Sequence, residues 1–262
     1  MKKYLKIILK YLQLSWMQGM EYRTNFIVWT CVDIGWTALD LIFFQALISN
    51  IKMIGNWNQA QSLIVIGTFR LLVFPVWGWL YASFNILPKS ISEGKLDMLL
   101  VKPVDSQFMV SVRQFSFSIL PSLVGGTGFL LLGIKELGYV PSWQNFAYYF
   151  LLLAISICLM YGMYFFTMAI TLFTERLDNI ANIFVSLYDA SRFPKEIYGI
   201  VLQRIFTTII PVALLLAVPS EALFLKPNWL LWGWLLILAV VFNVVARWIW
   251  QNGLRRYSSA SS

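Results

Sequence analysis

Residues 228–250 read NWLLWGWLLILAVVFNVVARWIW, and this stretch is the clearest transmembrane helix in the chain. About 20 consecutive apolar residues are enough for an α-helix to cross the hydrocarbon core of a bilayer. Tryptophans stand near both ends of the stretch, and tryptophan is enriched where a membrane helix meets water. The stretch therefore predicts a membrane span and indicates a membrane protein.

The composition extends this prediction to the whole chain of 262 residues. Hydrophobic residues make up 59% and charged residues only 12%, whereas soluble domains average about 45–50% apolar and about 25% charged residues. Histidine, the commonest general base and a common metal ligand, is absent. Cys31 and Cys158 both lie in apolar runs, so neither a disulfide nor a metal site follows from them. No apolar run near the N-terminus ends at a small-residue cleavage site, so we expect no cleavable signal peptide.

The apolar runs predict an all-α integral membrane protein with about six transmembrane helices. The expected spans cover residues 24–48, 62–87, 108–134, 146–173, 179–192 and 228–250. Residues 1–23 place Lys3, Lys6 and Lys10 on one helical face and apolar side chains on the other. This pattern predicts an amphipathic helix that lies in the membrane surface.

Two further segments separate the spans. Residues 88–105 form a polar stretch bounded by Pro88 and Pro103, which predicts a short surface helix between the second and third spans. Residues 199–225 are apolar but broken by a charge and two prolines, and broken backbone at membrane depth must be covered by protein or water. We therefore expect a re-entrant segment before the last span. In the alternative arrangement, residues 199–225 replace residues 179–192 as the fifth span.

The distribution of basic residues predicts the orientation. With the N-terminus in the cytoplasm and six crossings, most lysines and arginines fall on the cytoplasmic side, as the positive-inside rule requires. The net charge of +8 is then explained by anchoring in the membrane rather than by nucleic-acid binding. We expect both termini in the cytoplasm and membrane lipids, not nucleic acid, as the basic residues' partners.

No motif for nucleotide binding or catalysis occurs in the sequence. A phosphate-binding loop, a nucleophile elbow, an HExxH motif and paired cysteines are all missing. The cluster Gly125-Gly126-Thr127-Gly128 lacks the lysine of a phosphate loop and lies in an apolar run. Such glycines permit close contact between membrane helices or mark a flexible point. We therefore expect a chain that is not an enzyme and that binds no cofactor or metal itself.

Three charged residues fall inside the first two spans, namely Asp33, Asp40 and Arg70. Each costs about 2.5–3.5 kcal/mol at the centre of a membrane helix, so they should face protein or water. One interpretation is a structural ion pair between the two spans. The other is a polar path along which a substrate moves.

Three motifs, in order along the chain, resemble one bacterial branch of the ABC-2-type ABC exporters. They are Glu21-Tyr22-Arg23-x-Asn25-Phe26, Ile91-x-x-Gly94-x-Leu96-Asp97-x-x-Leu100-x-Lys102-Pro103 and Arg192-Phe193-Pro194-x-x-Ile197-Tyr198. The last motif is followed by Arg204, Pro211 and Pro219, and the resemblance covers essentially the whole chain. The short, charged fifth crossing departs from the family pattern.

The resemblance implies a permease subunit in the bacterial cytoplasmic (inner) membrane. Such permeases work as homodimers or heterodimers, and ATP and Mg²⁺ bind to a separate ABC ATPase subunit. The resemblance also implies a coupling helix that docks on this ATPase, formed by Ile91, Glu93, Gly94, Lys95, Leu96 and Asp97. Arg204, Pro211 and Pro219 would form an outer gate that controls substrate release.

Two other functions remain open at this point. A secondary transporter driven by an ion gradient would use Asp33, Asp40 and Arg70, although the internal repeats common in that class are not visible. A non-transporting membrane protein, such as an assembly or immunity factor, would need no ATPase. The sequence leaves the substrate open among drugs, lipids, peptides and sugars.

Overall fold

The computed structural model describes residues 2–50, 57–173, 180–193 and 197–257. The long helices are α1 Lys2–Glu21, α2 Arg23–Asn50, α3 Gln59–Val73, α8 Leu120–Glu136, α9 Trp143–Ala169 and α13 Trp229–Arg256. The shorter elements are η1 Phe74–Tyr81, α4 Ala82–Phe84, α5 Leu87–Ser92, α6 Asp97–Leu100, α7 Ser106–Ser111, η2 Phe117–Ile119, η3 Ile170–Leu172, α10 Ile180–Ala190, α11 Ile200–Thr208 and α12 Val212–Phe224. No β-strand occurs in these ranges, which confirms the all-α prediction.

Five helices in the described part of the chain are long and apolar enough to cross a membrane. They are Arg23–Ala46, Gln59–Ser92, Phe117–Glu136, Trp143–Leu172 and Trp229–Arg256. Ile200–Ile209 and Val212–Phe224 form a pair bent by 80°, and they make a sixth crossing if they count as one span. The structure thus confirms a membrane protein with about six spans.

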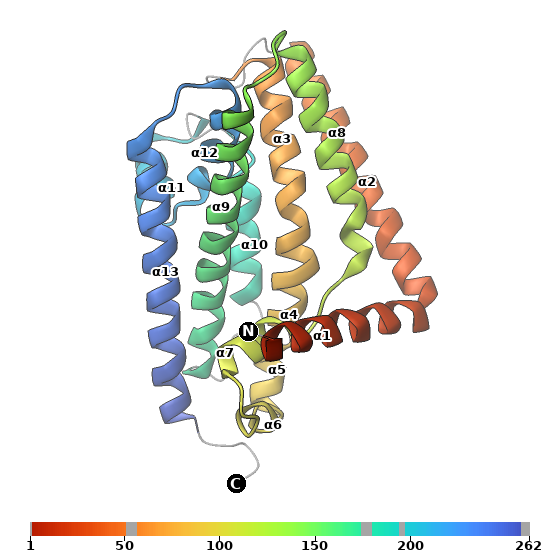
Figure 1. Ribbon diagram of the computed structural model, residues 1–262, viewed down its shortest axis with the longest axis vertical. Coiled ribbons are helices and arrows are strands. Elements are labelled where there is room, and N and C mark those ends of the chain that lie inside the picture. The colour runs from red at the N-terminus through yellow and green to blue at the C-terminus, as the bar shows by residue number, and fades with distance from the viewer. Residues whose placement is uncertain (1, 51–56, 174–179, 194–196, 258–262) are drawn as a thin grey trace.

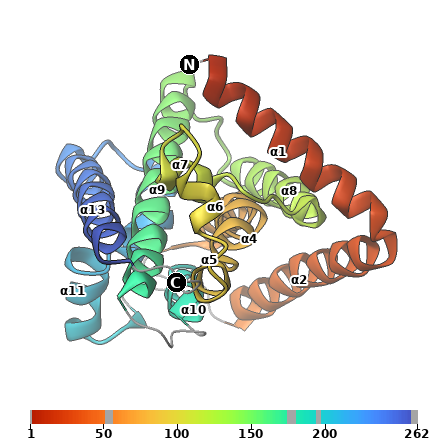
Figure 2. The ribbon, with the colours of Figure 1, turned by 90° about the horizontal axis from the view of Figure 1, so that it is seen from below.

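Helix α1 lies at one end of the bundle, where α5, α6 and α7 also lie, and it runs along the outer edge of the bundle; we call this the α1 end (Figures 1 and 2). Both α9 and α13 run from the opposite end to the α1 end, so the chain returns once between them (Figure 1). Helix α10 has 11 residues, a length of about 16 Å, which is shorter than the hydrocarbon core of about 30 Å. Helix α10 alone is therefore too short to be the predicted fifth span, residues 179–192, whereas the bent pair α11–α12 makes a crossing if it counts as one span.

The structure also places the third predicted span differently from residues 108–134. Helix α7 ends at Ser111 and α8 begins at Leu120, with an irregular stretch between them. The Ser116 amide donates to the Gly78 carbonyl at 2.7 Å instead of continuing a helix. Because the Ser116 amide bonds to η1, the spanning helix starts only at Phe117.

Glycines bring α3 and α8 into direct backbone contact. A Cβ added at Gly67 would lie 2.7 Å from the Leu130 amide nitrogen, and one added at Gly126 would lie 2.8 Å from the Leu71 amide nitrogen. These distances leave no room for any side chain, so the glycines set how closely the two helices approach. Of the two roles predicted for the glycine cluster, Gly126 has the packing role, whereas a Cβ at Gly128 would meet nothing within 4 Å.

Candidate functional site

The stretch predicted as one surface helix, residues 88–105, consists of two short helices joined by a turn. Helix α5 continues the second spanning helix through Ser92, and Pro88 stands in its first turn, where a missing N–H is tolerated. Gly94 has a φ of +67° and lies in the turn that separates α5 from α6. Glycine reaches this region at little steric cost, so the turn depends on Gly94.

The side chains of this α5–α6 segment divide into an anchoring set and an exposed set. Leu96 is fully buried in the main hydrophobic core, and Ile91 packs against that core. Met98 and Val101 are instead 68% and 85% exposed. Leu96, one of the residues predicted to contact a partner, is therefore part of the core, and Met98 and Val101 are exposed apolar side chains of the segment.

Charged side chains surround the turn. The Lys95 ammonium lies 2.5 Å from Glu93 Oε2, and the Lys89 ammonium lies 3.7 Å from Glu93 Oε1. The hydrogen bond from Lys95 lowers the pKa of the Glu93 carboxyl. Glu93 therefore stays ionised at neutral pH, and the turn presents a mixed charge pattern to the surroundings.

The end of this segment is tied to the last span. Asp105 caps α7 by accepting from the Phe108 amide at 3.0 Å, and it forms an ion pair with Arg247 of α13. Arg247 also donates to Gln107 Oε1 at 2.9 Å, and Trp250 Nε1 donates to Ser106 Oγ at 3.0 Å. The Arg247 hydrogen bond is the main reason that the pKa of the Asp105 carboxyl is lowered. The stretch after α6 is therefore linked to α13, while α5 is continuous with the helix that contains α3.

The intramembrane charges meet around Arg70, which is 4% exposed. Its guanidinium lies 2.5 Å from Asp40 Oδ2 and 3.7 Å from Asp33 Oδ1. The structure thus forms both pairs that the sequence suggested. Asp33 accepts two further hydrogen bonds from Ser122, at 2.9 Å from its amide and 2.6 Å from its hydroxyl.

Sequence reasoning missed a second guanidinium beside these charges. Arg192 lies 3.5 Å from Asp40 Oδ1 and 3.4 Å from Asp189 Oδ1. Its guanidinium also lies over the Phe69 ring, 5.3 Å from the centroid, where a cation–π interaction adds stabilisation. The sequence signal was the charged fifth crossing, because a charge at membrane depth needs a partner. Asp33, Asp40, Asp189, Arg70 and Arg192 together are called the intramembrane charge cluster below.

This charge cluster borders a cavity of about 350 Å³. Aromatic side chains Trp29, Trp36, Phe69 and Trp77 supply much of the remaining wall. The cluster is therefore both a packing element between α2, α3 and α10 and part of a polar surface at membrane depth. No group of three or more metal-ligating side chains occurs among the described residues.

The predicted gate residues lie on the bent pair rather than beside the charge cluster. Arg204 is an exposed residue of α11, whereas Pro211 precedes α12 and Pro219 lies inside it, both buried. Proline cannot donate a backbone hydrogen bond, which explains the break between the two helices. Pro194, from the third sequence motif, lies outside the described residues.

Comparison with protein families finds a match over most of the chain. The profile of the family described as ABC-2 family transporter protein matches residues 34–261. No curated protein and no solved structure matches the chain significantly. The profile covers the α5–α6 segment, the bent pair and, apart from Asp33, the intramembrane charge cluster.

Proposed function

Because this chain belongs to the ABC-2 transporter family and is therefore a membrane permease of an ABC-type transporter, we propose that it exports its substrate with energy from a separate ATPase. The ATP and Mg²⁺ would bind to that partner, since this sequence contains no phosphate-binding loop. We place the chain in a bacterial inner membrane, with the α1 end on the cytoplasmic side. Lys3, Lys89 and Lys95 lie at that end, as the positive-inside rule favours.

The observation that carries the proposal is the construction of the α5–α6 segment. It exposes Met98 and Val101 beside the charged turn, while Leu96 fixes it to the core. Exposed apolar groups next to charges are typical of a docking surface, because charges steer the encounter and apolar groups hold the complex. We assign this surface to the ATPase subunit.

In the proposed mechanism, movement of the α5–α6 segment reaches the spans through two links, one covalent and one ionic. When the ATPase subunits close on ATP, the α5–α6 segment moves with them. Helix α5 continues directly into the second span, and Asp105 pulls on Arg247 of the last span. The spans then open toward the opposite end of the bundle, where the bent pair α11–α12 controls release. A second permease, identical or related, would cover the exposed apolar face of α2.

The test uses two valines of similar exposure at opposite ends of the molecule. Val101 is 85% exposed in the α5–α6 segment, and Val140 is 81% exposed in the loop at the other end. Tagged protein with Val101→Glu or Val140→Glu is crosslinked in native membranes and purified in mild detergent. Proteins with a Walker motif are then identified by mass spectrometry.

We expect an ATPase subunit with the unsubstituted protein and with Val140→Glu, and its loss with Val101→Glu. Chromatography of each variant shows whether the membrane portion remains folded. If no ATPase is captured with the unsubstituted protein, the proposed energy source is wrong. If Val101→Glu retains the ATPase as well as Val140→Glu does, the docking surface lies elsewhere.

A further inference from the structure

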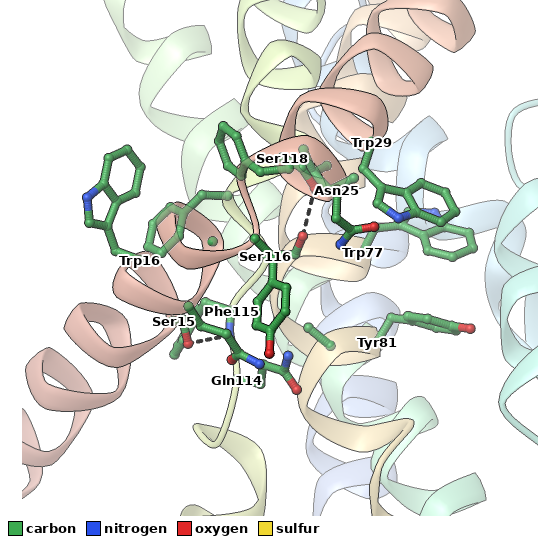
Figure 3. A pocket seen from close by; sticks show the side chains of 17 residues that line it. Ser15, Trp16, Asn25, Trp29, Trp77, Tyr81, Gln114, Phe115, Ser116 and Ser118 are labelled. Carbon is green, nitrogen blue, oxygen red and sulfur yellow. Dashed lines mark hydrogen bonds between the residues drawn. The ribbon is translucent and has the colours of Figure 1, made fainter.

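A second and larger cavity, of about 450 Å³, lies beside the C-terminal part of helix α1 (Figure 3). Its wall is formed by the end of α1, the start of α2, the π-helical segment η1 and the irregular stretch before α8. Because α1 lies at the end of the bundle and is steeply inclined to the long helices, the cavity lies at the level where the membrane surface is expected (Figure 1). We call it the α1 cavity.

The lining of the α1 cavity contains no charged side chain. It combines aromatic rings with uncharged hydrogen-bonding groups, including Trp16, Asn25, Trp29, Tyr81 and Gln114. An ionised ligand group would lose its hydration here without gaining an opposite charge, which is costly. An uncharged polar group can bond to the amides and hydroxyls, and an apolar chain can lie against the rings.

Unusual backbone structure builds this cavity. Residues Phe74–Tyr81 form a π-helix, a conformation found often at functional sites. The stretch opposite it is held open by long-range bonds: the Phe115 amide donates to Ser15 Oγ at 3.1 Å, and Ser83 Oγ donates to the Gln114 carbonyl at 2.7 Å. Non-helical backbone at membrane depth occurs where protein buries it or where it lines a cavity. The irregular stretch does both.

The α1 cavity adjoins the cavity of the intramembrane charge cluster. Trp29, Trp77 and Ile119 line both. These three side chains separate an uncharged compartment near the membrane surface from a charged compartment deeper in the bundle. A molecule in the α1 cavity is therefore one side-chain layer away from the intramembrane charge cluster.

We propose that the α1 cavity binds an uncharged amphipathic molecule taken from the bilayer, with a hydrogen-bonding headgroup and an apolar chain. The headgroup lies among the amide and hydroxyl groups, and the chain lies against the aromatic rings. Trp29, Trp77 and Ile119 form the barrier that it meets on the way inward. The binding requires only this chain in a membrane, so it stands apart from the proposed ATPase partner.

Gly19 and Gly35 provide a matched pair of substitutions. A Cβ at Gly19 would lie 3.4 Å from the Phe26 ring. Gly19 and Phe26 both line the α1 cavity. A Cβ at Gly35, on α2, would meet nothing within 4 Å. Leucine favours a helix more than glycine does, so neither Gly19→Leu nor Gly35→Leu should weaken its helix. Only Gly19→Leu fills the α1 cavity.

The experiment uses the full chain in phosphatidylcholine nanodiscs without nucleotide. The probe is a monoacylglycerol with a photoactivatable acyl chain, and the comparison is the phosphorylated, anionic molecule with the same chain. Labelled peptides are mapped by mass spectrometry. Labelling of the lipid-exposed residues Leu230 and Val244 of α13 measures ordinary contact with surrounding lipid.

For each probe, labelling of the cavity lining is divided by labelling of α13. We expect this ratio to be more than about tenfold higher for the neutral probe than for the anionic probe, which is equivalent to about 1.4 kcal/mol. Gly19→Leu should abolish this excess and Gly35→Leu should leave it unchanged. Equal labelling by the two probes would overturn the assignment of an uncharged ligand. Labelling confined to α13, or unaffected by Gly19→Leu, would overturn the binding site itself. Each outcome is independent of whether an ATPase binds the protein.

Discussion

Replacement of Arg70 by methionine tests how far the intramembrane charge cluster stabilises the fold. Methionine keeps an unbranched apolar stem like that of arginine, but it removes the guanidinium and its charge. Asp33 and Asp40, each 5% exposed, would then lose the guanidinium that lies 3.7 Å and 2.5 Å from their oxygens. Removal of one member of a buried ion pair typically costs about 3–5 kcal/mol, because it leaves a buried charge without compensation.

The neighbouring groups place the expected cost in the lower part of that range. Asp33 keeps two hydrogen bonds from Ser122, and Asp40 keeps Arg192 at 3.5 Å. We therefore expect Arg70→Met to lower the free energy of unfolding by about 3 kcal/mol. The double variant Arg70→Met/Asp40→Asn removes both charges of the closest pair, and it should recover much of this loss.

The assay is reversible unfolding in mixed micelles of a mild detergent and SDS. Arg204→Met is the matched control, because Arg204 is an exposed residue of α11; its free energy of unfolding should change by less than about 0.5 kcal/mol. A loss for Arg70→Met no larger than that of the control would refute the reasoning. So would a double variant that is no more stable than Arg70→Met alone.

Two other predictions concern contacts between helices. Gly126→Leu should destabilise the protein by about 1–3 kcal/mol, because the side chain must separate α3 from α8, whereas Gly128→Leu should be tolerated; equal unfolding free energies for the two variants would contradict this packing. The Asp105 carboxyl has a lowered pKa in the folded protein, so its pairing with Arg247 stabilises the fold above the ordinary carboxyl pKa of about 3.9 and is lost as pH falls through the lowered value. Asp105→Asn should therefore be less stable than the unsubstituted protein at pH 7, and the difference should shrink in acid; a difference that stays constant with pH would exclude this ion pair as the cause.

The sequence predicts secondary structure best where the pattern depends on neighbouring residues. Residues 228–250 predict the last span, and the structure extends this helix to Arg256. The polar stretch at residues 88–105 predicts one surface helix, whereas the structure joins its first part to the second spanning helix and divides it at Gly94, a single left-handed residue. The third span was expected to begin at residue 108, because the average hydropathy there does not show that Ser116 bonds to Gly78.

The family can also be predicted from the sequence, because the order of the motifs can be read without knowing which residues are in contact. The profile match confirms this family. The site did not follow to the same extent. The first two spans contain Asp33, Asp40 and Arg70. Because an unpaired charge in a bilayer costs free energy, the sequence predicts that these side chains have partners. The sequence did not show that Arg192, more than one hundred residues later, would join them.

The sequence by itself thus determined that this chain is a helical membrane protein with about six spans, because burial in lipid and helix formation depend on neighbouring residues. The tertiary structure alone decided which side chains meet. Leu96 is buried and Val101 exposed, although both belong to the same short polar stretch. The physical reason is that the rotation and separation of each helix are set by contacts such as those of Gly67 and Gly126, which join residues far apart in the chain.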